Sequence, residues 1–230
     1  IASVSVVEFI TLNPSATWMS ASSYPCDDAN LFDTVHAIIS ELCREFGISL
    51  PVGKYSLSMR SNLYENGNEY QVVAPFSLIV SAFAPVKNIR NHLTPDLKRI
   101  NERSKLLLID LGQGTERLGG SVLAQVFNLK GGLAPDVDIP SRLKVFFDGI
   151  QTLIKEKLIL AYHDRSDGGL LTTITEMMFA GHLGVSINLS GSAEKTLRYL
   201  FNEELGAVIQ VAESQLSDVQ EILENKEMHW

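Results

Sequence analysis

The residues best suited to chemistry in this chain lie in the stretch HDRSDGG. Its two carboxylates, Asp164 and Asp167, are hard oxygen donors, and Mg²⁺ usually takes one or two carboxylates together with phosphate oxygens. The hydroxyl of Ser166 can donate a hydrogen bond to a phosphate or another ligand oxygen. Gly168 and Gly169 allow a sharp turn that brings backbone N–H groups near a ligand. The stretch therefore predicts a metal and phosphate site.

The elements on either side place these polar groups at the end of a strand. The apolar run LILAY, residues 158–162, predicts a strand, and residues 168–181 predict an amphipathic helix. Ligands of α/β proteins tend to bind at the carboxyl ends of strands, and the N-terminus of a helix favours an anion. The alternative is a plain helix cap made by an Asp or a Ser, with an Arg–Asp pair kept for solubility. A cap needs one such residue, and the density of polar groups favours a site.

A second candidate is the stretch LPVGKYSLSMR. Gly53 and Lys54 are expected to form a turn ahead of a strand, where backbone N–H groups, the Lys54 ammonium and the Ser56 hydroxyl could hold a phosphate. It is not a P-loop, because the spaced upstream glycine is missing. The alternative is a solvated turn that leads into an edge strand.

Two further stretches carry weaker signals. In ERLGGSVLAQ, paired glycines and Ser121 open a helix, which is typical of an anion site and equally of a turn with a helix cap. In FNEELGAVIQV, Glu203 and Glu204 precede a buried strand and could serve as acid–base or metal groups. Paired carboxylates at a surface are more often simply solvated.

Strands and helices alternate along the whole chain. Hydrophobic spacing predicts a helix over residues 28–46, and two β-rich runs around Asn66 and Gly67 predict a hairpin. Residues 141–157 predict a helix with Ser141 as its cap. The remaining elements are expected as strands at 4–12, 105–112, 184–189 and 206–212, and as helices within 117–129 and at 193–201 and 213–226.

This alternation predicts an α+β or mixed α/β fold in two parts. The polar segment 88–105, with a Pro and few large apolar residues, is the best boundary. We therefore expect one domain over residues 1–104 and a second over residues 105–230.

Composition narrows the function classes. The chain has 230 residues with 45% hydrophobic and 20% charged residues, which is ordinary for a globular protein. A net charge of −8 and the lack of a Lys/Arg cluster argue against a nucleic-acid partner or an anionic membrane surface. No apolar run approaches the roughly 20 residues of a membrane span.

The cysteines and the N-terminus add two expectations. Cys26 and Cys43 match neither a metal site nor a disulfide framework, and Cys43 lies on an apolar helical pattern as buried filler, so a reducing, cytoplasmic compartment is expected. The first residues alternate like a strand without a Met or a basic region, which argues against a signal peptide and predicts a fragment of a longer protein.

Several segments together resemble one enzyme family, the phosphoribosylformylglycinamidine synthases of purine biosynthesis in their large single-chain bacterial form. The segments are AYHDRSDGGLLTTITEMMFAGHLGVSINL, LLLIDLGQG, RLGGSVLAQVF, FNEELGAVIQV and VGK-SLSM, and they run from about Thr17 to Val211. The resemblance implies a two-part unit similar to aminoimidazole ribonucleotide synthetase, in which a dimerisation-type α+β domain precedes an ATP-associated domain. The synthetase core of the family contains this two-part unit twice. The chain resembles the second copy, truncated at its N-terminus.

The resemblance also implies a reaction and its partners. The family converts formylglycinamide ribonucleotide, glutamine and ATP to the amidine, glutamate, ADP and phosphate, with Mg²⁺ and with ammonia supplied by a glutaminase domain. The chain itself contains no glutaminase triad, so it is expected to need the rest of the synthetase core and to be inactive alone. The alternatives are a structural module that holds ATP or ADP without turnover, and a relative similar to aminoimidazole ribonucleotide synthetase.

Residue roles carry over by position. Asp164 resembles a magnesium ligand of a nucleotide site and Ser166 a nucleotide contact, while the partner metal ligands of the family, Glu-x-x-x-Asn, would fall just before Ile1. The stretch Gly-Lys-Tyr-Ser resembles a segment of the substrate half, in which the Ser, here Ser56, contacts the ribonucleotide. Tyr55 stands where the family usually has Asp, which removes an acceptor and adds bulk. No role follows for the two glutamates of FNEEL.

Overall fold

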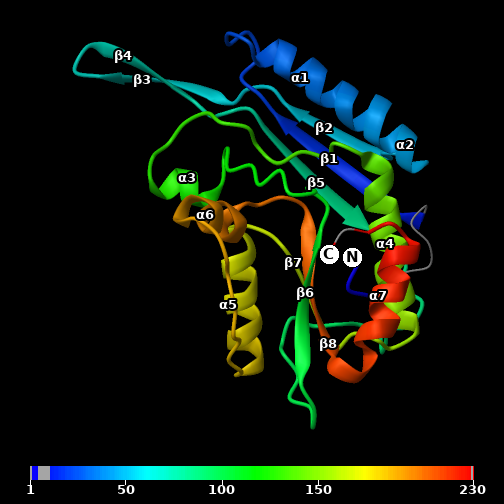
Figure 1. Ribbon diagram of the computed structural model, residues 1–230. Coiled ribbons are helices and arrows are strands. Elements are labelled where there is room, and N and C mark those ends of the chain that lie inside the picture. The colour runs from blue at the N-terminus through cyan, green and yellow to red at the C-terminus, as the bar shows by residue number, and fades with distance from the viewer. Residues whose placement is uncertain (1, 5–10, 229) are drawn as a thin grey trace. The chain divides into compact units, whose positions relative to one another are not determined.

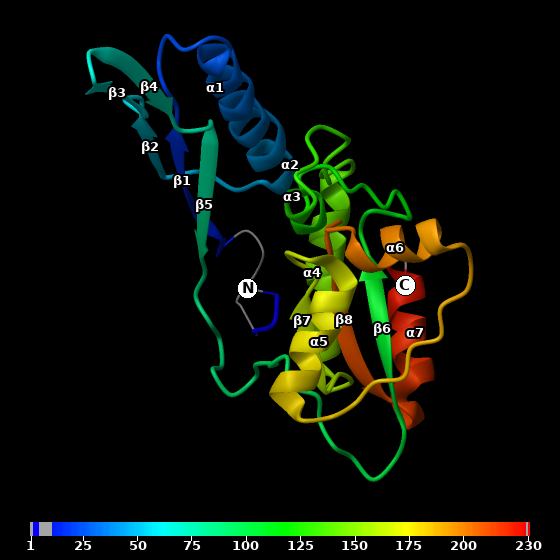
Figure 2. The ribbon, with the colours of Figure 1, turned by 90° about the vertical axis from the view of Figure 1, so that its left-hand side faces the viewer.

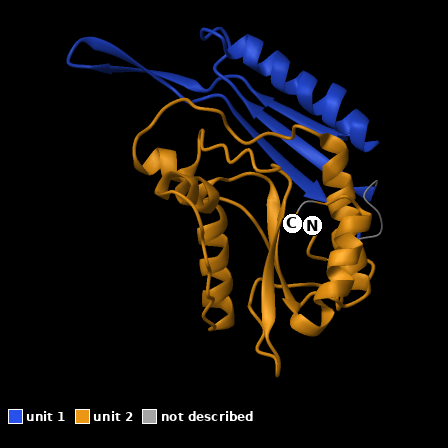
Figure 3. Cartoon of the chain, viewed as in Figure 1, with its two compact units in different colours: residues 1, 7–85 blue, residues 2–6, 86–230 orange. Residues whose placement is uncertain are grey.

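The computed structural model describes residues 2–4, 11–228 and 230. It divides into two compact units, of which the first comprises residues 1 and 7–85 and the second residues 2–6 and 86–230 (Figure 3). Both units combine helices with strands, which confirms the mixed α/β class. The domain boundary expected between residues 104 and 105 stays a prediction.

Unit 1 is built on a three-stranded sheet in the order β2-β1-β5 (Figure 1). Its strands are β1 (Asn13–Met19), β2 (Val52–Ser56) and β5 (Ser77–Phe83). β2 runs parallel to β1 and β5 runs antiparallel to it. Ala16 and Trp18 alternate with more exposed neighbours and are buried, as expected for a strand with one covered face.

A helical stretch and a hairpin complete unit 1. α1 (Asp27–His36), a π-helical segment (Ala37–Cys43) and α2 (Arg44–Phe46) follow one another and run alongside the sheet in Figures 1 and 2. β3 (Arg60–Glu65) and β4 (Asn68–Val73) pair antiparallel, and the two residues between them both have positive φ. The predicted helix, the buried position of its cysteine and the Asn-Gly hairpin are thus confirmed.

The first strand of unit 1 departs from the expectation. The strand expected at residues 4–12 falls mainly on residues 5–10, which lie outside the described residues. β1 begins at Asn13 instead, and the sequence analysis missed it because Asn-Pro is a turn signal. Pro14 lies before the pairing of β1 with β2, which begins at Ser15, so β1 is an edge strand at this position, where proline is tolerated.

Unit 2 is built on a second three-stranded sheet, in the order β6-β8-β7. Its strands are β6 (Ser104–Asp110), β7 (Ala161–Asp164) and β8 (Gly206–Ala212). Its helices are α3 (Val122–Val126), α4 (Pro140–Lys155), α5 (Gly169–Gly181), α6 (Ala193–Phe201) and α7 (Leu216–Asn225), the last preceded by a 3₁₀ turn (Glu213–Gln215).

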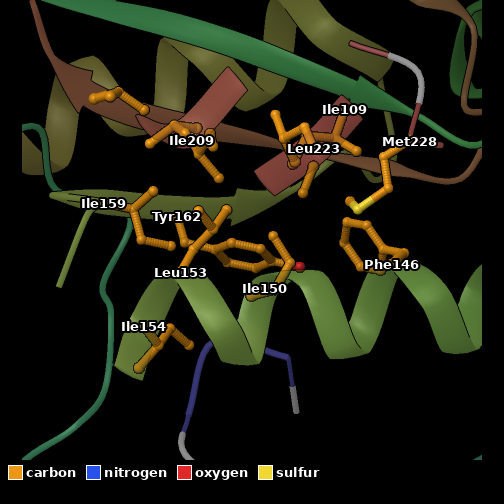
Figure 4. Close-up of a cluster of buried hydrophobic side chains, with 13 residues drawn as sticks. Ile109, Phe146, Ile150, Leu153, Ile154, Ile159, Tyr162, Ile209, Leu223 and Met228 are labelled. Carbon is orange, nitrogen blue, oxygen red and sulfur yellow. The ribbon is translucent and has the colours of Figure 1, made fainter. Parts of the chain in front are cut away.

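Period-two alternation along β8 divides the core of unit 2 between the two faces of the sheet. Ile209 and Val211 join a cluster with residues of α4 and α7, whereas Val208 joins a second cluster with residues of α5. Figure 4 shows the first cluster, with Leu153 of α4 and Leu223 of α7 directed toward the strands. In Figure 1, α5 lies on one side of the sheet and α4 and α7 lie on the other.

Two expectations in unit 2 are wrong. Residues 184–189 do not form a strand, although their side chains alternate as a strand requires. A strand needs a paired neighbour, and this segment and β6 instead both line a hollow of about 690 Å³. The cap of α4 is Ile139 with Pro140 at the first helical turn, so Ser141 lies inside the helix. The fixed φ of proline suits that position.

Among the described residues, no helix combines the length and the apolar character that a membrane crossing requires.

The core cluster on the α4 side gives a stability prediction. Leu153 is fully buried, so Leu153→Ala should lower the free energy of unfolding by about 2–5 kcal/mol, because it removes apolar contacts and leaves a cavity. Leu129→Ala is the matched control: this side chain is 66% exposed, and the change should stay within about 0.5 kcal/mol. Urea titrations followed by circular dichroism measure both; equal losses would contradict the assignment of the core.

Candidate functional site

Two strands of unit 2 end at the same edge of its sheet. β6 and β7 are both antiparallel to β8, so they run in the same direction. Asp110 ends β6 opposite Gly206, and Asp164 ends β7 opposite Ala207. The loops that follow the two strands therefore meet around the start of β8, and this edge is the candidate site.

The carboxylate of Asp164 is exposed and held at one oxygen. Tyr162 Oη donates a hydrogen bond of 2.5 Å to Asp164 Oδ1. Burial raises the pKa of Tyr162 far above its usual range, and the negative charge and hydrogen bond of Asp164 raise it further. Tyr162 therefore stays protonated and orients the carboxylate, while no donor among the described residues bonds Oδ2. One oriented oxygen remains for a ligand.

The turn after Asp164 has no side-chain cap. Gly168 is the capping residue of α5 in the left-handed region, with φ 82°, and no side chain caps the helix. Ser166 is exposed, and its carbonyl oxygen accepts a hydrogen bond of 2.9 Å from the N–H of Gly169. The alternative that an Asp or a Ser of this turn serves as a helix cap is therefore wrong.

Arg165 is the anchor of this turn. Its side chain is only 2% exposed and forms an ion pair of 2.5 Å with Asp110. Nε also donates to the carbonyl oxygen of Glu204 at 2.5 Å, and Nη2 donates to that of Leu205 at 3.0 Å. The alternative of a solubility pair is wrong, because a buried arginine with three acceptors joins β6, β7 and the start of β8.

Glu204 is buried as well, and Arg117 neutralises it. Its side chain is 1% exposed; Oε1 accepts hydrogen bonds from Arg117 Nε at 2.7 Å and from Thr115 Oγ1 at 2.8 Å, and Oε2 accepts one from Arg117 Nη2 at 2.8 Å. Burial by itself would raise the pKa of Glu204, but these hydrogen bonds outweigh it and hold the pKa below its usual value. The interpretation of Glu204 as a solvated surface carboxylate is wrong.

Glu203 connects the two helix starts that were candidates for anion binding. Its Oε1 accepts a hydrogen bond of 2.8 Å from the N–H of Val122, at the start of α3, and one of 2.8 Å from the N–H of Gly168. Ser121 caps α3 by accepting from the N–H of Ala124 at 3.2 Å, so a turn with a helix cap is confirmed there. The role of Gly168 as a nucleotide contact stays a prediction, and its N–H is bonded to Glu203 in this structure.

The second candidate lies in unit 1 and is not a turn. Gly53, Lys54 and Ser56 are all part of β2, paired in parallel with β1. The expected turn is wrong because the segment gains ladder hydrogen bonds as a strand. Lys54 is exposed, and Tyr55 stacks on Trp18 with ring centroids 5.2 Å apart. Tyr55 thus packs against its own sheet, and the predicted substrate contacts of Lys54 and Ser56 stay predictions.

Two observations concern the metal ligands near the candidate site and the position of the hollow in unit 2. Over residues 2–4, 11–228 and 230, no group of three or more His, Cys, Asp and Glu side chains is gathered as metal ligands. Asp164 supplies one carboxylate, which is compatible with Mg²⁺ that is otherwise bound by phosphate oxygens. The hollow of about 690 Å³ in unit 2 is lined by none of the six predicted site residues.

The sequence analysis missed the ionic network beneath the turn. Asp110 accepts hydrogen bonds from the N–H groups of Gly112, at 3.2 Å, and Gly114, at 2.9 Å, as well as from Arg165. Asp110 lies near the end of the strand expected over residues 105–112 and ends the observed β6, so the rule that selected Asp164 would have selected it. No local pattern signals the partnership of Arg117 with a glutamate 87 residues away.

The sequence matches two protein families. Residues 1–85 match the FGAR-AT PurM_N-like domain, and residues 105–230 match the C-terminal domain of AIR synthase related proteins.

Solved structures share the fold at low sequence identity. PurLQS from Thermotoga maritima is 11% identical with a TM-score of 0.61, over 96% of this chain and 33% of that one. T. maritima PurL is similar in its complex with ADP (11% identity, TM-score 0.60, 96% and 32% coverage) and in its complex with FGAR (13%, 0.59, 96% and 35%). E. coli HypE, a hydrogenase maturation protein, is 16% identical with a TM-score of 0.57, over 97% of this chain and 66% of its own. The chain thus spans about a third of the PurL chains.

The buried carboxylate gives a pH-dependent prediction. Glu204→Gln should lower the free energy of unfolding at pH 7 by about 3 kcal/mol, because Arg117 loses its neutralising partner. The contribution of Glu204 is fully present above its unfolded pKa of about 4.3 and is lost as the pH falls through its lower folded pKa. Denaturant titrations from pH 7 to pH 2 should therefore show the difference between wild type and variant shrinking below about pH 4.

The control for this series is Glu194→Gln. Glu194 pairs with Arg198 on the surface of α6, with 77% of its side chain exposed, so its loss should cost under about 0.5 kcal/mol at every pH. A Glu204→Gln difference that stayed constant with pH would contradict the charged, arginine-bound state of Glu204.

The glycines of the turn give a second prediction. Gly169 has φ 71°, and a Cβ there would lie 2.6 Å from the carbonyl oxygen of Asn202. Gly169→Ala should therefore destabilise the protein by about 1–3 kcal/mol, through strain and collision. Gly184→Ala is the matched control, since a Cβ there meets nothing within 4 Å, and its effect should be within about 0.5 kcal/mol. Thermal melting compares the two, and a neutral Gly169→Ala would refute the close approach.

Proposed function

Because this chain belongs to the family of AIR synthase related proteins, we propose that it is part of an ATP-dependent ligase of the FGAR amidotransferase kind and supplies one wall of a nucleotide site. The observation that carries the proposal is the end of β7, where a protonated Tyr162 orients the exposed carboxylate of Asp164 beside a glycine turn. Such an edge combines an anionic metal ligand with the exposed hydroxyl of Ser166, and both groups suit a Mg-nucleotide.

The solved structures support the proposal that the enzyme binds both a nucleotide and a ribonucleotide substrate. T. maritima PurL, which shares this fold, binds ADP in one structure and FGAR in another. We extend both ligands to this chain, with formylglycinamide ribonucleotide as the substrate of the whole enzyme. Since the chain spans about a third of PurL, the complete reaction belongs to the longer protein of which we propose it is a part.

The finer assignment rests on the quoted sequence segments. We propose the large single-chain bacterial type, with this chain as the second repeat of its synthetase core and with domains over residues 1–104 and 105–230. In that enzyme ATP phosphorylates the amide oxygen of formylglycinamide ribonucleotide, and ammonia released from glutamine by a glutaminase domain displaces the phosphate. The products are the amidine, glutamate, ADP and phosphate, and a cytoplasmic location belongs to the same proposal.

Individual residues receive roles from the same reasoning. Asp164 would bind Mg²⁺, which neutralises phosphate charge, and Ser166 would donate its hydroxyl to the nucleotide. In unit 1, Lys54 and Ser56 are two residues apart on β2, so their side chains share one face of that strand. That face would contact the ribonucleotide, and the backbone of Gly53, in the same strand, would contact the nucleotide.

A second candidate function is a module that holds a nucleotide without turning it over. It is compatible with a site in which Asp164 supplies one carboxylate and, among the described residues, belongs to no group of three or more ligating side chains. A relative similar to aminoimidazole ribonucleotide synthetase is a further alternative, and the shared C-terminal domain is compatible with it.

Calorimetric titration of the chain with Mg-ADP tests the proposed site. Wild type should bind, and Asp164→Asn should weaken binding at least about tenfold, because it removes the charged metal ligand and keeps the acceptor for Tyr162. Asp148→Asn, an exposed change on α4, should leave binding unaltered. If wild type released no heat with Mg-ADP and showed no thermal stabilisation, the nucleotide site would be refuted.

An assay of the parent protein distinguishes a catalytic site from a holding site, which binds the nucleotide without turning it over. Supplied with formylglycinamide ribonucleotide, glutamine and Mg-ATP, it should release ADP and glutamate. A catalytic site predicts that Asp164→Asn abolishes turnover in a stable protein, whereas a holding site predicts lower thermal stability with turnover per folded molecule retained.

A further inference from the structure

We propose that Glu203 is a positioning residue of the nucleotide site, which holds the turn from Asp164 to Gly168 in its binding shape. This inference rests on the proposed function, because it assumes that the turn binds a nucleotide. A single carboxylate oxygen of Glu203 accepts one hydrogen bond from Gly168 and one from Val122, both of 2.8 Å. These two amides belong to separate loops, 46 positions apart, so one side chain ties the loops together.

The backbone that carries Glu203 is held on both sides. Asn202 is 2% exposed, and its Nδ2 donates to the carbonyl oxygens of Arg198, at 2.8 Å, and Tyr199, at 3.2 Å. On the other side, Glu204 is buried against Arg117. Glu203 itself is partly exposed between these anchors. Its carboxylate is therefore presented from a rigid support rather than from a free loop.

The bonded amides are ones that need an acceptor. The first N–H groups of a helix have no partner within the helix, and a carboxylate near them is favoured by the helix dipole. α5 has no side-chain cap of its own, so Glu203 supplies from a distant segment the acceptor that the turn lacks. Gly168 is in the left-handed region, and Gly169 lies against the backbone of Asn202. The start of α5 thus packs closely against the segment that carries Glu203.

This arrangement clamps the turn at both ends. Tyr162 holds Asp164 at the strand end, and Glu203 holds Gly168 at the helix end. Ser166 lies exposed between the two clamps. Release of one clamp would free the turn to fluctuate, and a ligand would then have to order it on binding, at a cost in affinity. Glu203 would act on the nucleotide through the turn, without touching it.

The test measures amide exchange and Mg-ADP affinity on the same variants of the full chain. Glu203→Ala removes the acceptor, Glu203→Gln keeps an oxygen acceptor without the charge, and Glu221→Ala changes an exposed carboxylate on α7 as the control. Nuclear magnetic resonance follows hydrogen exchange at Gly168 and Val122, with Ile209 of the core as the reference for global folding. Calorimetry gives the Mg-ADP dissociation constants.

In Glu203→Ala, exchange at Gly168 and Val122 should rise together by about tenfold or more while Ile209 stays protected, and the Mg-ADP dissociation constant should rise by about tenfold. Glu203→Gln should keep amide exchange and the Mg-ADP dissociation constant close to their wild-type values, because it retains an oxygen acceptor. Glu221→Ala should change neither quantity. The inference is overturned if exchange at the two amides does not change, or if it rises while wild type and Glu203→Ala bind Mg-ADP equally. Failure of the proposed function is distinguishable, because wild type itself would then not bind Mg-ADP although exchange at the two amides still depended on Glu203.

Discussion

The polar edge of unit 2 depends on one buried charge, the carboxylate of Glu204. It lies at the point where α6 gives way to β8, and it is neutralised by Arg117 from a loop far away in sequence. A buried carboxylate without such a partner is strongly unfavourable, so the ion pair holds the loop after β6 against the segment that leads into β8. A methyl group at Gly112 would lie 2.7 Å from the Cβ of Glu204, which indicates how closely this loop is packed onto it.

The segment Asn202–Glu204 thereby becomes the support of the whole candidate site. Through Glu204 it holds the loop after β6, and its backbone accepts a hydrogen bond from Arg165 in the turn after β7. Through Glu203 it holds the start of α5. Two loops, the one after β6 and the turn from β7 into α5, are thus positioned by one short stretch, which leaves Asp164 and Ser166 exposed. Buried ionic groups form this scaffold, whereas Asp164 and Ser166, for which we propose the ligand contacts, are exposed.

In unit 1, the second candidate for a phosphate-binding turn takes a different conformation from the one its sequence predicts. Gly53 and Lys54 were expected in a turn because glycine and lysine before a strand suggest a phosphate loop. In the structure they lie within β2, and Tyr55 stacks on Trp18 of the adjacent strand. Pairing with β1 decides the conformation here, since a parallel partner supplies hydrogen bonds that the isolated segment lacks.

The sequence by itself determined the elements whose signals are local: the helix that ends at Phe46 before Gly47, the Asn-Gly hairpin, and the polar turn between β7 and α5. Hydrophobic spacing and turn chemistry act within a few residues, so they can be read without a fold. Only the tertiary structure decided that residues 184–189 stay unpaired, that Arg165 is buried, and that Glu203 and Glu204 serve the turn from a distance. Those outcomes depend on pairings between segments up to 87 residues apart, and an acceptor's identity is settled only when the packed chain brings a donor to it.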